Sequence, residues 1–164
     1  MNWGSLLFSF EGRINRAKYW LAALVYFVLS VVLSLVGLAI GSDSIAFSAL
    51  NMVVGIAIFI SGIAVGVKRL HDRNRTGWWL LLFYVLPGVL IAAAAVYGLI
   101  ATGLAIGDAP GASIANFGIA GFLMLAASLI MLWAFIELAC LRGTIGPNRF
   151  GPDPLDVSVT APAH

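Results

Sequence analysis

Four long runs with almost no charge constrain the fold of this chain more than any other feature. They span about residues 19–40, 45–67, 78–100 and 114–139, and Glu137 is the one charged residue within them. A helix needs about 20 residues to cross the hydrocarbon core of a bilayer, so each run is long enough to do so. The chain is also 62% hydrophobic and only 10% charged, with a mean hydropathy of +1.03. This composition is typical of an integral membrane protein.

The runs are predicted to be helices. Lipid offers the backbone no hydrogen-bond partner, so a membrane span must be a helix or part of a closed barrel, and the runs lack the alternating polarity of barrel strands. The first run is too long for the apolar region of a signal peptide. We therefore expect an all-α integral membrane four-helix bundle made of two hairpins. A single domain is predicted over residues 1–156, followed by a disordered tail at 157–164.

The basic residues fall into three groups outside these runs. The groups are Arg13, Arg16 and Lys18 before the first run, Lys68, Arg69, Arg73 and Arg75 between the second and third, and Arg142 and Arg149 after the fourth. The two other connections hold one acid each, Asp43 and Asp108, and no base. Because Lys and Arg in short loops stay on the cytoplasmic side, both termini and the middle loop are predicted to be cytoplasmic. The expected location is the inner (plasma) membrane, with multiple passes.

The residues before the first run predict a short amphipathic helix. Trp3, Leu6, Leu7 and Phe10 recur at helical spacing and form an apolar stripe that ends at Gly12. Such a helix is expected to lie along the cytoplasmic interface of the membrane. Further along the chain, Pro87 falls near the middle of the third run and predicts a kink there.

Small residues recur at helical spacing in the first two runs, where they allow helix backbones to approach closely. They are Ser30, Ser34, Gly37 and Gly41 in the first run and Gly55, Gly62 and Gly66 in the second. Packing within one hairpin is the simpler explanation. Self-association through Gly62 and Gly66, which would make a homo-oligomer, is the alternative.

Three polar motifs resemble those of a known family. They read EGRINRAKYW at residues 11–20, VKRLHDRNRTGWW at 67–79 and RGTIGPNRFGPDP at 142–154. In this order they are similar to domain-of-unknown-function family 805, the YhaH-like small bacterial inner-membrane proteins. The resemblance implies a membrane location and four helices, and it implies no activity. If the topology is right, the three motifs lie on one side of the membrane and converge on one polar surface.

Little in the sequence points to catalysis. His71 and Asp72 are adjacent, but one such pair does not complete a metal site, and an ion-paired or capping role is favoured. Cys140 is the single cysteine, which excludes a cysteine-rich metal site. No catalytic residue, metal or cofactor is predicted.

Glu137 is a candidate functional residue because a carboxylate inside a membrane span is costly. An ion pair with a cytoplasmic arginine such as Arg69 or Arg16 would satisfy it. The alternative is proton or cation handling, although a lone carboxylate provides no relay chain.

The basic residues are the best candidates for ligand binding, since arginine matches phosphate geometry and bases near the membrane attract anionic headgroups. The candidates for an anionic lipid or phosphate site are Arg13, Arg16, Lys68, Arg69, Arg73, Arg75 and Arg149. Alternatively, these residues only set the topology. Nucleic acid is not an expected partner, because the net charge is only +2.

The leading functional hypothesis is a non-enzymatic inner-membrane protein whose basic cytoplasmic face binds anionic lipid or a partner protein. The second hypothesis is an oligomeric channel or transporter component. The third is an enzyme that acts on lipid headgroups at the loop that holds His71 and Asp72.

Overall fold

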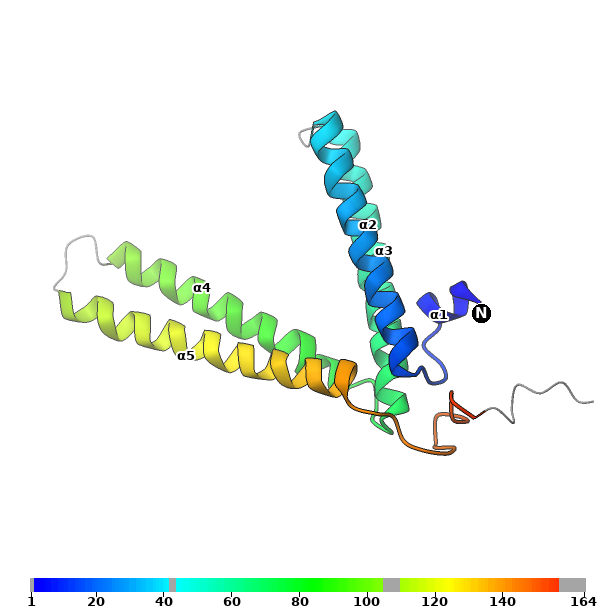
Figure 1. Ribbon diagram of the computed structural model, residues 1–164. Helices are drawn as coiled ribbons and strands as arrows, with labels where there is room; N and C mark the ends of the chain where they lie inside the picture. Colours follow the sequence, from blue (N-terminus) through cyan, green and yellow to red (C-terminus); the bar gives the residue numbers. More distant parts are fainter. Residues whose placement is uncertain (1, 42–43, 105–109, 157–164) are drawn as a thin grey trace, which may run out of the picture. The chain divides into compact units, whose positions relative to one another are not determined.

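The computed structural model of the protein describes residues 2–41, 44–104 and 110–156. Within these residues the regular elements are helices, and four of them are long and apolar enough to cross a membrane (Figure 1). They are α2 (Arg16–Ile40), α3 (Ile45–Asp72), η1 (Leu81–Val85) continued by α4 (Leu86–Leu104), and α5 (Pro110–Phe135) continued by η2 (Ile136–Cys140). The predicted all-α fold with four apolar helices is confirmed. The tail at 157–164 lies outside the described residues.

The chain divides into two compact units. One unit consists of Met1–Gly77 together with Leu138–His164, and the other of Trp78–Glu137. Each unit contains one helical hairpin, α2 with α3 and α4 with α5, as predicted (Figure 1). The assignment of residues 1–156 to a single domain stays a prediction.

Side-chain caps define the hairpin of α2 and α3. The Asn15 side chain accepts a hydrogen bond from the Lys18 backbone N–H at 2.9 Å and begins α2, and Ser44 caps α3 in the same way. Gly41, at φ 89°, ends α2. The helices approach closely beside this turn, because a Cβ atom on Gly37 would lie 2.6 Å from the Phe47 ring. At least one small residue predicted for helix packing therefore serves the hairpin itself.

The long helices expose large apolar side chains instead of burying them. Phe27 on α2 is 66% exposed and Phe59 on α3 is 68% exposed. In the second unit, Leu99 and Phe122 are 72% and 69% exposed. Apolar surface of this extent is unfavourable in water, so these faces are suited to contact with lipid chains.

The short helix α1 (Trp3–Phe8) confirms part of the predicted N-terminal helix. Its Leu6 side chain is buried in a cluster with Ile14, Ala22 and Val65. The prediction that Phe10 belongs to this helix is wrong, since the chain is extended at Ser9. The Ser9 hydroxyl accepts a hydrogen bond from the Glu11 N–H, a local bond that competes with helix continuation.

The second unit accommodates its proline with a π-helical turn. Pro87 has no N–H to donate, and its ring would crowd the preceding turn. Immediately before it, η1 widens the helix, and the Leu86 N–H donates to the Leu81 carbonyl. Beside this turn the buried Phe83 ring packs edge-on against Trp133, with ring centres 5.3 Å apart. A π-helical turn thus lies immediately before Pro87, and the kink predicted there stays a prediction.

Candidate functional site: a junction of three polar segments

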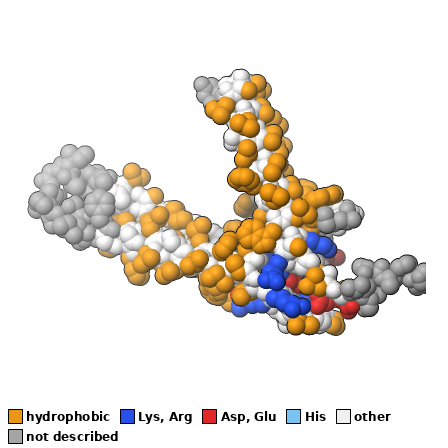
Figure 2. Space-filling model, viewed as in Figure 1, with side chains coloured by type: hydrophobic (Ala, Val, Ile, Leu, Met, Phe, Trp, Pro, Cys, Tyr) orange, Lys and Arg blue, Asp and Glu red, His pale blue; other side chains and the backbone are white. Residues whose placement is uncertain are grey.

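The three polar motifs of the sequence meet at one end of the α2 and α3 hairpin. The backbone N–H of Thr144 donates to the Asp72 carbonyl at 2.8 Å, and the Arg13 Nη1 donates to the Gly146 carbonyl at 2.8 Å. We call the assembly of residues 11–20, 67–77 and 138–156 the junction. Figure 2 shows the Lys and Arg side chains gathered at this end of the unit. The predicted convergence of the three motifs is confirmed.

A buried ion-pair cluster lies at the centre of the junction. One carboxylate oxygen of Asp72 accepts hydrogen bonds from Arg13 Nε at 3.2 Å and from Arg13 Nη2 at 3.1 Å. The other oxygen is bonded to Arg69 Nη1. The Arg13, Arg69 and Asp72 side chains are 1%, 0% and 5% exposed. Asp72 therefore has the ion-paired role that the sequence favoured over catalysis.

The C-terminal segment packs directly against this cluster because Gly143 has no side chain. A Cβ atom on Gly143 would lie 1.9 Å from the Asp72 Oδ2 atom. The Thr144 hydroxyl adds a second hydrogen bond to the Asp72 carbonyl, at 3.1 Å. Arg13 extends across to the same segment, where it also donates to the Thr144 carbonyl at 2.6 Å. One arginine and one aspartate thus join all three motifs.

Side chains of the junction also cap five consecutive carbonyls at the end of the last helix. The carbonyls at a helix C-terminus have no intrahelical partner, and they carry a partial negative charge that favours cations. The hydrogen bonds run from Arg69 to Leu138 and Leu141, from Trp20 to Ala139, from Arg16 to Cys140, and from Arg73 to Arg142. Three arginines predicted to bind a ligand therefore also stabilise a helix end.

Lys68 is buried as well, with 3% of its surface exposed. Its ammonium group donates to the Ser5 carbonyl at 2.6 Å and to the Leu6 carbonyl at 2.5 Å. These carbonyls belong to α1. Of the seven basic residues predicted as ligand contacts, Arg13, Lys68 and Arg69 are thus turned into the protein.

The His71 ring takes part in a stack at the edge of the junction. It lies parallel to the Phe150 ring, with centres 3.9 Å apart, and its Nδ1 atom is 3.2 Å from the Gly12 carbonyl oxygen. The Arg149 guanidinium lies 4.7 Å from the centre of the Phe150 ring and donates to the Asn74 carbonyl at 3.1 Å. His71 therefore helps to seat the C-terminal segment.

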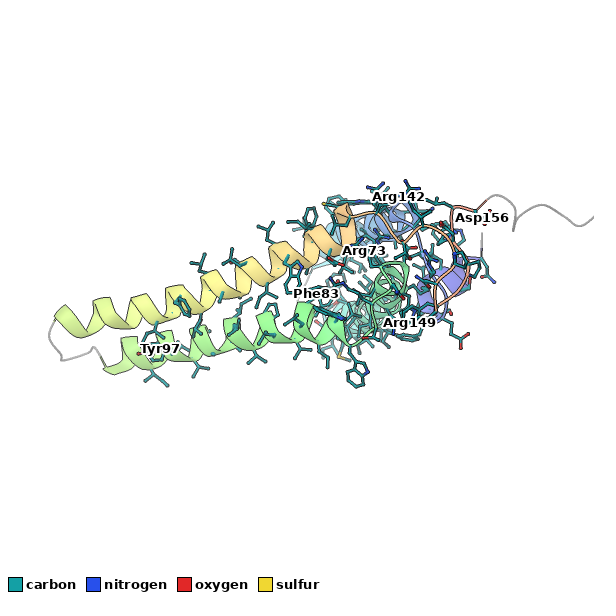
Figure 3. All side chains as sticks on the ribbon, turned by 90° about the horizontal axis from the view of Figure 1, so that it is seen from below. Arg73, Phe83, Tyr97, Arg142, Arg149 and Asp156 are labelled. Carbon is teal, nitrogen blue, oxygen red and sulfur yellow. The ribbon has the colours of Figure 1, made fainter. Side chains whose placement is uncertain are left out.

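The remaining bases face outward. Arg16, Arg142 and Arg149 are exposed, and Lys18, Arg73 and Arg75 are half-buried. Figure 3 labels Arg73, Arg142 and Arg149 at this end of the unit. In the part of the chain that the structure describes, no hydrogen bond joins the Lys18 or Arg142 side chain to another residue. Lys18 and Arg142 are missing from the predicted ligand contacts, although no hydrogen bond in the described residues holds either side chain.

The pKa of the Asp153 carboxyl lies below its ordinary value. The main cause is the hydrogen bond from the Leu155 N–H, followed by the one from the Gly146 N–H at 2.9 Å. These bonds favour the ionised form. They fold the C-terminal segment into the turn that places the Gly146 carbonyl beside Arg13.

Glu137 is 3% exposed and lies in η2, and its pairing with Arg69 or Arg16 stays a prediction. Self-association through Gly62 and Gly66 also stays a prediction. Gly66 is buried within the first unit, and Gly62 is half-buried.

Comparison with known proteins identifies the family. A model of the family described as "Protein of unknown function (DUF805)" matches residues 7–152. The chain belongs to this family. The match includes the three segments of the junction almost in full, so the junction is part of the DUF805 region.

Several relatives come from Escherichia coli strain K12. Inner membrane protein YhaH is 30% identical over 88% of this chain and 86% of its own length. Inner membrane protein YhaI is 33% identical over 88% and 85% of the two chains. The uncharacterized protein YiiR is 32% identical over 94% and 92%. No solved structure matches. Together with the four apolar helices, these names support a multi-pass inner-membrane protein.

Proposed function

We propose that this DUF805 protein is a non-enzymatic inner-membrane protein whose junction binds the headgroups of anionic lipids at the cytoplasmic surface. The observation that carries the proposal is the division of the basic residues. Arg13, Lys68 and Arg69 are buried and bonded to the protein, whereas six other bases surround the same junction with their side chains exposed or half-buried. The buried set orders the junction, and the outer set provides a basic surface.

The contacts within the junction support one orientation in the membrane. The N-terminal segment, the end of α3 and the C-terminal segment are hydrogen-bonded to one another, so they belong on the same side of a bilayer. All nine Lys and Arg residues lie in these segments. The positive-inside rule makes that side cytoplasmic.

The position of the bases suits anionic lipid. A base near a membrane surface attracts anionic headgroups by about 1 kcal/mol. Arginine also offers a planar set of donors that matches a phosphate group. Trp20 is 49% exposed, and its indole N–H donates to the Ala139 carbonyl. Aromatic residues of this kind are found at headgroup level. Six outward bases in this layer would favour anionic over zwitterionic lipids.

Native mass spectrometry of the purified protein in mild detergent would test the proposal. The variant carries Lys18→Gln with Arg142→Gln, because in the described residues no hydrogen bond ties these side chains to another part of the junction. Loss of two bases at about 1 kcal/mol each should weaken retention of phosphatidylglycerol by roughly 30-fold. The control carries Lys18→Arg with Arg142→Lys, which keeps both charges and should retain the lipid.

Two results would contradict the proposal. One is equal retention of phosphatidylglycerol and phosphatidylcholine by the unmodified protein. The other is unchanged retention of phosphatidylglycerol by the neutral variant while its thermal stability matches that of the control. Either result would favour a partner protein as the ligand of the basic surface.

A further inference from the structure

Three carbonyls near the C-terminal end of α1 accept hydrogen bonds from side chains of the long apolar helix α3. Lys68 on α3 donates to the Ser5 and Leu6 carbonyls, and the Ser61 hydroxyl, also on α3, donates to the Leu7 carbonyl at 2.8 Å. The Tyr26 hydroxyl on α2 lies 2.7 Å from the Ser61 hydroxyl and completes the chain of bonds. Three successive carbonyls of a six-residue helix thus receive protein donors.

Such caps are needed where water is scarce. At an aqueous surface, water satisfies the free carbonyls of a helix end. In the hydrocarbon layer, an unsatisfied carbonyl costs several kcal/mol, so the protein itself must provide the donors. A lysine and a serine that are 3% and 2% exposed and directed at these carbonyls are suited to that layer.

Two helices give the same depth for the end of α1. On α3, Ser61 lies seven residues before Lys68, the first base after the apolar run, which corresponds to about 10 Å along the helix axis. On α2, Tyr26 lies seven residues after Tyr19, the first aromatic residue of the interface, again about 10 Å. The Leu7 carbonyl, which is bonded to Ser61, therefore lies about 10 Å along the helix axes from the level of the Lys68 and Tyr19 backbone.

We propose that α1 is inserted into the acyl-chain layer of one leaflet, where Trp3, Phe8 and Phe10 contact lipid chains. These side chains are 46%, 53% and 46% exposed. The occupant of this surface is lipid, because these apolar side chains belong to a segment in which three successive carbonyls are bonded to buried side chains of α3. Only the identity of the leaflet, the cytoplasmic one, rests on the proposed function.

The residues after α1 lead the chain from the proposed insertion back to the junction. After Phe8 the chain is extended at Ser9, turns at Gly12, where φ is 84°, and reaches Asp72 through Arg13. The N-terminal segment therefore enters the leaflet beside α3 and is tied to the junction at its other end. It adds apolar volume to a single leaflet, as amphipathic helices that respond to lipid packing do.

Spin labelling in phosphatidylcholine vesicles would test the insertion. A nitroxide is attached at Phe8→Cys in a Cys140→Ala background, and its collision rates with oxygen and with a water-soluble nickel chelate are compared. The reference sites are Phe27→Cys on the exposed face of α2 and Ile145→Cys in the C-terminal segment, where Ile145 is 79% exposed. We expect the Phe8 site to collide with oxygen several times more often than with nickel, as the Phe27 site does. A ratio equal to that of the Ile145 site would overturn the proposal.

A second variant tests the role of the caps. Lys68→Met keeps an unbranched side chain, one heavy atom shorter, and removes the donor, so the Phe8 label should become several-fold more accessible to nickel while the Phe27 label is unchanged. No change at the Phe8 site would overturn the role assigned to the caps. Because phosphatidylcholine is zwitterionic, these results are independent of whether the outer bases bind anionic lipid.

Discussion

Replacement of Asp72 by asparagine should strongly destabilise the unit that contains the junction. Asp72→Asn keeps the size of the side chain and removes the carboxylate that pairs with two buried guanidinium groups, those of Arg13 and Arg69. Removing one partner of a buried ion pair costs about 3–5 kcal/mol, because the other charge is left uncompensated. We expect a loss in that range, and its upper part is favoured because two cations lose the same partner.

The assay is reversible unfolding by sodium dodecyl sulfate in mixed micelles, followed by far-ultraviolet circular dichroism. The control is Glu11→Gln, which removes an exposed carboxylate from the same region and should change the free energy of unfolding by less than about 0.5 kcal/mol. In the double variant Arg13→Gln with Asp72→Asn, the loss should be smaller than the sum of the two single losses. A loss below about 1 kcal/mol for Asp72→Asn would refute the view that this cluster holds the junction together.

Two further predictions concern the C-terminal segment. Gly143→Ala should cost about 1–3 kcal/mol by overpacking against Asp72, whereas Gly55→Ala, whose added methyl meets no atom within 4 Å, should cost nothing in the same unfolding assay. The Asp153 carboxyl should titrate by carbon NMR with a midpoint below 3.8, its ordinary value. Because the pKa of this carboxyl is lower in the folded turn, its ionised form stabilises the turn at pH values above the unfolded pKa. This stabilisation is lost as the pH falls through the folded pKa. The chemical shift of the Gly146 amide should therefore change at the same midpoint. A midpoint at or above 3.8 would contradict the hydrogen bonds assigned to this carboxylate.

The sequence was sufficient to predict the four apolar helices and the meeting of the polar motifs. Long uncharged runs have few structural solutions in lipid, and the distribution of Lys and Arg determines which segments share a side. The interfacial position of the N-terminal helix was predicted from a stripe that included Phe10. The local hydrogen bond at Ser9 ends the helix earlier, and such competition is hard to read from spacing alone.

The division of the bases into buried and exposed sets was not predicted, although one signal pointed to it. Ser61, Val65, Lys68 and Asp72 follow one another at spacings of four, three and four, which places them on one face of a helix. All four are buried in the structure.

Other contacts of the junction cannot be predicted from residue types or their spacing. The acceptors of Arg16, Arg69 and Arg73 at the last helix end are backbone carbonyls, which every residue has. Which arginine reaches which carbonyl depends on how the C-terminal segment folds back on α3. The need for glycine at position 143 likewise depends on its contact with Asp72.

Chemical labelling of single cysteines tests most directly whether the three polar segments form one cytoplasmic junction. Glu11→Cys, Thr76→Cys and Ile145→Cys, each in a Cys140→Ala background, place one thiol in each segment. A maleimide that does not cross membranes should label all three in inverted inner-membrane vesicles and none of them in intact spheroplasts. Labelling of any of the three in spheroplasts, with a periplasmic control protein labelled and a cytoplasmic one protected, would contradict the account.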